Sequence, residues 1–355
     1  MRAAPFIKLP NKSLEAKVQF RYGLLMAIMI AIISAAACAS AAEFFQKSGP
    51  LLHTFVELKA YGDNETADVL DGAFTEMERV NSLLNNYDPS SEVSALNTAS
   101  SRRWVTISPD TFEALNIAQT YARLSGGAFD FTVGPLVSLW GFNKDQPGLA
   151  DEDPSQAMIK DTMRLVDYRA LKFIRHQSVI SGRLEHSGMR IDVGAFSKGF
   201  AADKALYFLQ HHGITSALVA AGGTICAVGS KPDGQPWQIG IRHPRNDSSF
   251  LTVVALRDQS VSTSGDYEKF YYKAGKRRSH IIDPRTGYPV TAIQSVTVIA
   301  PTGIASDSLS TSLFVLGPAD GIRLIKKLPG CEALIVTADG EVVYTNGWPQ
   351  KTIIY

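Results

Sequence analysis

Cysteine is scarce in this chain: Cys38, Cys226 and Cys331 are the three cysteines among 355 residues. They cannot form the closely spaced pairs of a structural zinc site, and they are too few for a disulfide framework. Cys226 and Cys331 lie in apolar surroundings, TICAVG and GCEALIV. We therefore predict buried free thiols on strands rather than a disulfide between them.

An excess of basic residues is also lacking. Residues 1–42 hold five of the 35 Lys and Arg and one of the 34 Asp and Glu, so 30 bases face 33 acids in the remainder, a net charge of about −3. Electrostatic binding of nucleic acid is not expected from such a balance. The 45% hydrophobic and 19% charged residues are ordinary for a globular protein with a full-sized core.

The N-terminus differs from the rest of the chain. An uncharged run, Tyr22 to Ala42, follows five scattered cations and ends in small residues. This is the arrangement of an export signal, with cleavage after Ala39 or Ala42. The run is also long enough for a retained membrane anchor, and Cys38 is a candidate for lipidation. We predict that residues 1–42 are a signal peptide or N-terminal anchor of an exported protein.

Internal repeats and low-complexity linkers are absent, so residues 43–355 are expected to form one globular unit, long enough for two lobes. Apolar periodicity predicts helices over 68–84, 109–125, 200–212 and 305–316. Strands are predicted over 55–60, 190–193, 217–220, 225–228, 237–241, 251–256, 270–272 and 296–300. A C-terminal hairpin is predicted to turn at 338–340, and residues 149–156 are predicted to form a surface loop. Because strands outnumber helices and often follow one another directly, the fold class is α+β rather than a doubly wound sheet.

The segment from Ser262 to Pro289, STSGDYEKFYYKAGKRRSHIIDPRTGYP, is the densest in functional residue types. Its aromatic rings, cations and single histidine predict the rim of a site for a charged aromatic ligand. The unperturbed pKa of histidine lies near neutrality, so His280 is a candidate acid, base or hydrogen-bond donor to a phosphate, although a lone histidine is more often structural. The basic run from Lys276 to Arg278 is interpreted as a solvated turn.

Two further strings carry polar groups that suit a phosphate and a cation. In DVGAFSKG, Asp192 ends a predicted strand and Lys198 precedes a helix, which suits phosphate oxygens but also fits a plain turn with a solvated lysine. In ASDSLST, Asp307 and Thr311 are four residues apart and share a helix face. They could hold a hard cation, yet a helix cap at Ser306 or Asp307 explains the string equally simply.

Two glycine turns complete the candidate motifs. GGAFDFTVGP presents Phe129, Asp130 and Thr132 after paired glycines, where they could bracket a planar ring. Trp140 and Phe142, which follow in LWGF, fit core aromatics better. AAGGT, from Ala220 to Thr224, either lets a ligand approach the backbone or makes a tight connection, and its pattern leaves both open.

Together and in this order, the strings resemble the ApbE family of FAD:protein FMN transferases. The matching strings are NSLLNNYDPSSEVSALN, GGAFDFTVGPLVSLWGF, DVGAFSKGFAADKA, STSGDYEKFYY, SHIIDPRTGYP and SVTVIAPTGIASDSLSTSLFVLG. The resemblance covers residues 66–317 and continues loosely to the C-terminus. It implies an α+β fold related to the T-fold.

The resemblance also implies an activity. Members of this family cleave FAD with Mg²⁺ and attach FMN through its phosphate to a Thr or Ser of an acceptor protein, releasing AMP. The usual acceptors belong to membrane redox complexes, which implies a periplasmic location. The run from Lys276 to Arg278 could contact such an acceptor instead of forming a solvated turn. Alternatives are an FAD pyrophosphatase that releases free FMN and AMP, and a non-catalytic flavin-binding protein.

Site residues carried over by motif fall into three sets. The metal would be held by the carbonyl of Ala195 with Asp307 and Thr311, and His280 would be catalytic. FAD would contact Ala128, Phe129, Asp130, Asp192, Lys198 and Ile282. Two strings depart from the family pattern: Thr224 follows the paired glycines where many relatives have an acid, and Ser48-Gly49-Pro50 stands nearest to the usual Met-Gly-Thr.

Overall fold

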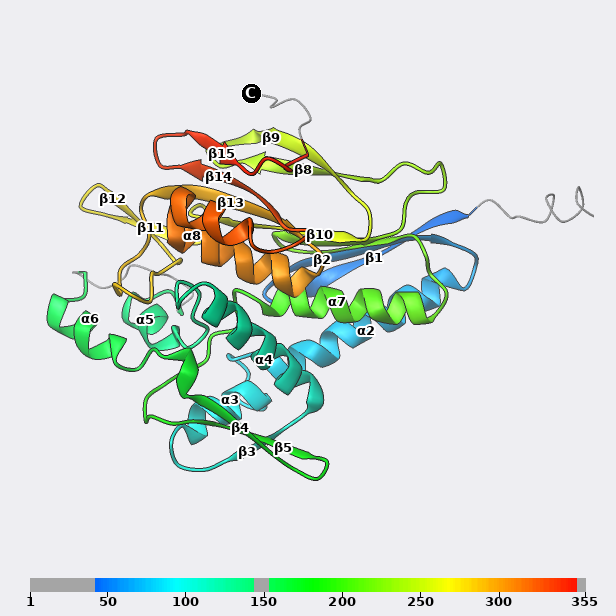
Figure 1. The fold of residues 1–355 in the computed structure, drawn as a ribbon. Helices are drawn as coiled ribbons and strands as arrows, with labels where there is room; N and C mark the ends of the chain where they lie inside the picture. Colours follow the sequence, from blue (N-terminus) through cyan, green and yellow to red (C-terminus); the bar gives the residue numbers. More distant parts are fainter. Residues whose placement is uncertain (1–41, 144–152, 350–355) are drawn as a thin grey trace, which may run out of the picture. The chain divides into compact units, whose positions relative to one another are not determined.

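The computed structural model describes residues 42–143 and 153–349 (Figure 1). The chain divides after Glu43, and all elements discussed below belong to the unit that starts at Phe44, apart from the first residue of β1. The predicted export segment and residues 149–152 of the predicted surface loop lie outside the described residues. Within the described residues, no helix has both the length and the apolar character needed to cross a membrane.

An eight-stranded sheet forms the centre, in the order β1-β2-β6-β7-β10-β13-β14-β15. Its long strand β13 (Ile293–Ala300) is buried along its whole length, and it pairs antiparallel with both of its neighbours. The other strands are β1 (Glu43–Leu51), β2 (Thr54–Gly62), β6 (Ala217–Ala221), β7 (Thr224–Val228), β10 (Gln259–Gly265), β14 (Glu332–Thr337) and β15 (Val342–Tyr344).

Three helices cover one face of this sheet: α2 (Thr66–Leu84), α7 (Ser197–His211) and α8 (Gly303–Ile325) (Figure 1). Helix α7 packs on β6 and β7, whereas α8 packs on β10, β13 and β14. Helix α8 bends at Gly317, whose backbone is not helical, and Pro318 follows. Proline lacks the N–H that would continue the ladder, which explains the bend.

The hairpin of β8 (Trp237–His243) and β9 (Asn246–Leu256) covers the opposite face of the sheet. Strand β8 alternates buried and exposed residues, as expected for a strand with one face on the core. Its Trp237, Ile239 and Ile241 pack with Val261 and Ile299 of the central sheet. Strand β13 is therefore covered on both faces, which accounts for its complete burial.

A second lobe surrounds α4 (Pro109–Leu124), which Ser108 caps through the N–H of Thr111 (3.2 Å). It contains the three-stranded sheet β3-β5-β4 and several short helices. Their bounds are α3 (Glu92–Ala99), β3 (Val105–Ile107), α5 (Gly134–Leu139), α6 (Gln156–Met163), η1 (Tyr168–Ala170), β4 (Leu171–His176) and β5 (Val179–Leu184). Together the lobes confirm the predicted α+β class.

Most predicted elements are confirmed with small shifts of their ends, and four predictions need correction. Residues 190–193 form only an isolated bridge between Arg190 and Val133, because the chain turns there toward α7. The run from Lys276 to Arg278 is in a strand, β12 (Lys276–Ser279), and not in a solvated turn.

Cys226 is buried on β7 as predicted, but Cys331 is half-buried and precedes β14. Asp307 and Ser306 do not cap α8, because the helix begins at Gly303 and Thr302 caps it.

Candidate functional site

Helices α7 and α8 cross at two glycines, Gly199 and Gly303. A Cβ built on either residue would overlap the carbonyl of the other, so any side chain there would push the helices apart. Asp203, one turn along α7, accepts hydrogen bonds from the N–H groups of Gly303 (2.6 Å) and Ile304 (2.9 Å) at the start of α8. This carboxylate satisfies donors that every helix start leaves open. Burial raises the pKa of Asp203 to about 6.

The crossing brings Asp307 of α8 against the first turn of α7. Its buried carboxylate accepts the N–H of Gly199 through Oδ2 (3.1 Å), and the ammonium of Lys198 lies 3.8 Å from the same oxygen. Lys198 also donates to the carbonyl of Gly194 (2.5 Å). Among the described residues, Oδ1 of Asp307 has no hydrogen-bond partner. Asp307 is therefore a ligand candidate with one oxygen anchored and one open.

The bond from Gly199 to Asp307 satisfies a donor at the start of α7. Gly199 is the third residue of this helix, so its N–H has no acceptor within the helix itself. The carbonyl of Ala195, two residues before the helix begins, accepts no hydrogen bond from the described residues. The predicted ligand Ala195 thus has an unused backbone oxygen in the loop that leads into α7.

Thr311 lies one helical turn beyond Asp307, as predicted from the spacing. Its Oγ1 is 3.2 Å from Oγ of Ser264 on β10, which also lies 2.8 Å from Oγ of Ser310. Ser264 can therefore orient the Thr311 hydroxyl. A carboxylate, a hydroxyl and a carbonyl are oxygen donors of the type that Mg²⁺ accepts when water and phosphate complete its shell. The residues present thus fit such a cation, and the described residues contain no cluster of three His, Cys, Asp or Glu side chains.

His280 stands at the rim directly after β12. Its Nδ1 lies 3.2 Å from the carbonyl of Lys269, which can only accept, so Nδ1 carries the proton and Nε2 the lone pair. Desolvation of the ring, together with the positive charges of Lys269 and Lys198, lowers the pKa of His280 to about 4. The imidazole is therefore neutral at pH 7 and can accept a proton through Nε2.

Asp192 connects the loop before α7 to the glycine turn that begins at Gly126. Its N–H donates to the carbonyl of Phe131 (2.8 Å), and its Oδ1 accepts the N–H of Gly194 (2.9 Å). Tyr87, which lies in a matching string but was not named as a site residue, is near enough for the Asp192 carboxylate to add to the effect of burial in raising the pKa of the phenol. The DVGAFSKG string and the GGAFDFTVGP turn, more than 50 residues apart in the sequence, are thus adjacent.

The predicted flavin contacts are less open. The side chains of Ala128 and Phe129 are buried in the core, as is that of Ile282. Both oxygens of Asp130 are occupied: Oδ1 accepts the N–H (2.8 Å) and hydroxyl (2.6 Å) of Thr132, and Oδ2 accepts the N–H of Tyr168 (2.9 Å). Burial raises the pKa of Asp130. Ala128 packs in one buried cluster with Ala305 and Leu309 of α8, whereas Ile282 packs with Trp140 and Phe142. The roles of all four predicted contacts toward FAD stay predictions.

The structure also shows where the two departures from the family pattern lie. Thr224 is buried and bonds Ser262 across the sheet (Oγ1 to Oγ, 2.9 Å). Ser48-Gly49-Pro50 lies inside β1. Another residue, Thr54, borders the paired glycines: a Cβ on Gly222 would lie 3.0 Å from Oγ1 of Thr54 and 3.6 Å from Cδ of Lys198. The turn after β6 therefore borders the site beside Lys198.

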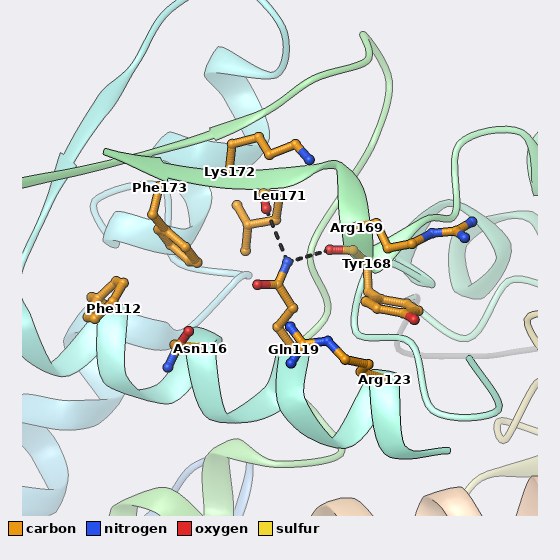
Figure 2. A pocket seen from close by; sticks show the side chains of 9 residues that line it. All are labelled: Phe112, Asn116, Gln119, Arg123, Tyr168, Arg169, Leu171, Lys172 and Phe173. Carbon is orange, nitrogen blue, oxygen red and sulfur yellow. Dashed lines mark hydrogen bonds between the residues drawn. The ribbon is translucent and has the colours of Figure 1, made fainter. Parts of the chain in front are cut away.

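A separate hollow of about 650 Å³ lies between α4 and β4 (Figure 2). Gln119 crosses it and donates to the carbonyls of Tyr168 (2.8 Å) and Leu171 (3.1 Å). No predicted site residue lines the hollow, although Asp130 holds the backbone of Tyr168 from behind. It is therefore distinct from the oxygen donors at the crossing of α7 and α8.

Sequence patterns did not identify Asp203 or Ser264 as functional residues. Asp203 binds the start of α8, and Ser264 bonds the Thr311 hydroxyl. Asp203 could have been found by its spacing, since it lies on the same face of α7 as Gly199. Ser264 was inside the singled-out segment, but no local pattern shows that it faces α8.

Comparison with known proteins shows the family to which the chain belongs. The family model described as the ApbE family matches residues 52–335, and the chain belongs to that family. A Treponema pallidum protein named FAD:protein FMN transferase is 33% identical, over 93% of this chain and 94% of its own length. A protein of the same name from Haemophilus influenzae is 30% identical over 90% of this chain and 94% of its own.

Solved structures are similar over the same range. The ApbE protein of Thermotoga maritima superposes with a TM-score of 0.78 at 30% identity, covering 86% of this chain and 97% of its own. The flavin transferase ApbE of Vibrio cholerae gives a TM-score of 0.74 at 29% identity, covering 86% and 98%. The α+β fold described above is thus shared with these structures.

Proposed function

We propose that the protein transfers FMN from FAD to a Thr or Ser hydroxyl of an acceptor protein, through a phosphoester bond, with release of AMP. The observation that carries the proposal is the meeting of Lys198, Asp307, Thr311 and the free carbonyl of Ala195 at the crossing of two helices. The activity named for the relatives from Treponema pallidum and Haemophilus influenzae supports it.

Asp307, Thr311 and the Ala195 carbonyl would hold Mg²⁺. When bound, the cation would neutralise charge on the pyrophosphate oxygens. Lys198 places a fixed ammonium at the N-terminal turn of α7, where the helix dipole also favours anions. These groups bind the pyrophosphate and stabilise the charge that develops as the phosphorus–oxygen bond breaks.

His280 would take the proton of the attacking hydroxyl at Nε2. The acceptor oxygen forms a bond to the phosphorus on the FMN side, the bond from that phosphorus to the bridging oxygen breaks, and AMP leaves with the bridging oxygen. A neutral imidazole is required, and the lowered pKa of His280 supplies it above about pH 4.

The test is to incubate the purified protein with FAD, Mg²⁺ and a flavin-acceptor domain, and to measure protein-bound flavin fluorescence and the mass of added FMN. Free FMN and AMP without labelled protein would identify the pyrophosphatase alternative instead. Neither product would identify the flavin-binding protein.

Two measurements address His280. His280→Ala should lower transfer by about 100-fold or more with FAD binding retained. The rate of the wild type should fall as pH falls through about 4, because protonation removes the Nε2 lone pair, and far-UV circular dichroism should show that the protein is still folded there. An acidic limb near 6.5, the ordinary histidine value, would contradict this role.

We also propose that the enzyme is exported to the periplasm, with its N-terminal segment as signal or anchor. The cations and apolar run within residues 1–42 support this location. Cys38→Ala would abolish membrane association if that cysteine carries a lipid, and would leave it unchanged otherwise.

A further inference from the structure

The hairpin of β11 (Phe270–Lys273) and β12 has no assigned role in the reaction above. Its two strands pair with each other, and within the described residues they belong to no larger sheet. Ala274 and Gly275 form the turn with positive φ angles of 47° and 72°. Figure 1 shows the hairpin projecting beside α8. From 270 to 279 it carries four cations and no acid: Lys273, Lys276, Arg277 and Arg278.

Strand β12 is fixed to the protein by two ion pairs. Arg277 bonds Asp266 (3.1 Å), a buried carboxylate that Arg245 also holds through two bonds of 2.7 and 2.6 Å. Arg278 donates twice to one oxygen of Asp153 (3.1 and 2.5 Å), just before α6. These charge-assisted bonds hold the hairpin at two neighbouring residues, so it is a defined surface.

The outer face of the hairpin combines aromatic rings with positive charge. The guanidinium of Arg277 lies 4.2 Å from the ring centre of Phe270 and 5.4 Å from that of Tyr272. These rings are 36% and 63% exposed, and Lys276 beside them is exposed. Tyrosine and arginine dominate the residues that contribute most to protein–protein binding.

The hairpin is connected directly to the catalytic candidate. His280 follows β12, and its N–H donates to the carbonyl of Lys269 (3.0 Å) just before β11. An acceptor hydroxyl that reaches Nε2 of His280 must therefore arrive beside the base of this hairpin. Whatever chain carries that hydroxyl will have its neighbouring residues near the hairpin.

We propose that the β11–β12 hairpin is the docking element for the acceptor protein, and that it binds an acidic segment next to the accepting Thr or Ser. The exposed ammonium of Lys276 attracts carboxylates of the segment, and Phe270 and Tyr272 provide apolar contact area. This inference rests on the proposed function, because it takes the accepting chain to be a protein.

The test measures binding without turnover. A fluorescent twelve-residue peptide with one Thr flanked by Asp and Glu is titrated with FAD-free protein, and its anisotropy is compared with that of the same peptide carrying Lys in place of the acids. The wild type should bind the acidic peptide at least about tenfold more tightly. Tyr272→Ala and Lys276→Glu should each weaken this binding by about fivefold or more.

Arg103→Glu is the matched control, because Arg103 is an exposed cation in the other lobe, before β3. It should bind both peptides as the wild type does, and thermal unfolding should show all variants folded. Equal binding of the two peptides, binding of neither, or hairpin variants that bind like the wild type would overturn the proposal. Incubation of a flavin-acceptor domain with FAD and Mg²⁺ tests the function separately: a protein that binds the acidic peptide but adds no FMN to the domain contradicts the transfer and not the docking.

Discussion

The crossing of α7 and α8 and the turn from Gly126 to Thr132 are both glycine-rich, and the sequence suggests a ligand at each. At the crossing, glycine allows two backbones to touch, and among the described residues the Ala195 carbonyl and one oxygen of Asp307 have no hydrogen-bond partner. In the turn, glycine supplies positive φ angles, and the Asp130 carboxylate is used entirely by Thr132 and Tyr168. A glycine motif therefore marks an unusual backbone, whereas the polar atoms left open decide whether it can bind a ligand.

The largest expected effect comes from Asp307 at the crossing, and Asp130 in the turn is its counterpart. Asp307→Asn should weaken Mg²⁺ binding by more than about 100-fold, because a charged ligand becomes neutral. Transfer should fall by about 1,000-fold, while the amide oxygen can still accept from Gly199 and the fold should persist. Titration calorimetry with Mg²⁺ and the flavin-transfer assay measure both quantities.

Asp130→Asn is the counterpart in the turn. Its amide N–H₂ would face backbone N–H groups, so the free energy of unfolding should fall by about 1–3 kcal/mol, with Mg²⁺ affinity unchanged. Urea denaturation measures the loss. Equal effects of the two substitutions on Mg²⁺ affinity would remove the distinction between the regions.

Glycine substitutions separate close packing from backbone conformation. Gly199→Ala should destabilise the protein by about 3 kcal/mol, since the new methyl group overlaps the backbone of Gly303. Gly126→Ala has open space around its Cβ, so its cost should be about 1 kcal/mol, from the φ angle of 63°. Chemical denaturation of both variants decides the point, and a larger loss at Gly126 would contradict the packing argument.

The smallest expected effect concerns Ser264. Ser264→Ala removes the partner of the Thr311 hydroxyl and should weaken Mg²⁺ binding by about tenfold. Ser260→Ala is the control, because Ser260 lies on the same face of β10 and bonds Ser306 (3.0 Å), away from Thr311. Its Mg²⁺ affinity should be that of the wild type. If both serines change the affinity alike, Ser264 acts through the fold and not through Thr311.

Strand β10 shows why part of the fold was not predictable. Its sequence, QSVSTSG, has no apolar alternation, because Ser260 and Ser264 face hydroxyls of α8. The hydroxyls buried on that face are satisfied by hydrogen bonds, so hydrophobic periodicity does not detect the strand. Strands such as β8, which place apolar side chains on the core, were predicted within a few residues of their ends.

The capping hypothesis for Asp307 failed for a related reason. Thr302 accepts the N–H of Ala305 and starts α8 earlier than the apolar pattern indicates, which moves Asp307 into the second turn. From there its carboxylate cannot cap its own helix, and it accepts from α7 instead. Local propensity allows either start, and packing of the two helices selects one.

By itself the sequence determined the α+β class, the order of motifs by which it resembles the ApbE family, and the shared helix face of Asp307 and Thr311. These follow from local periodicity and residue type. Only the tertiary structure decided that Asp307 accepts from Gly199 across 108 residues, that Asp130 serves the fold, and that the basic run forms a fixed hairpin. Such pairings depend on which surfaces pack together, and packing is a property of the whole chain.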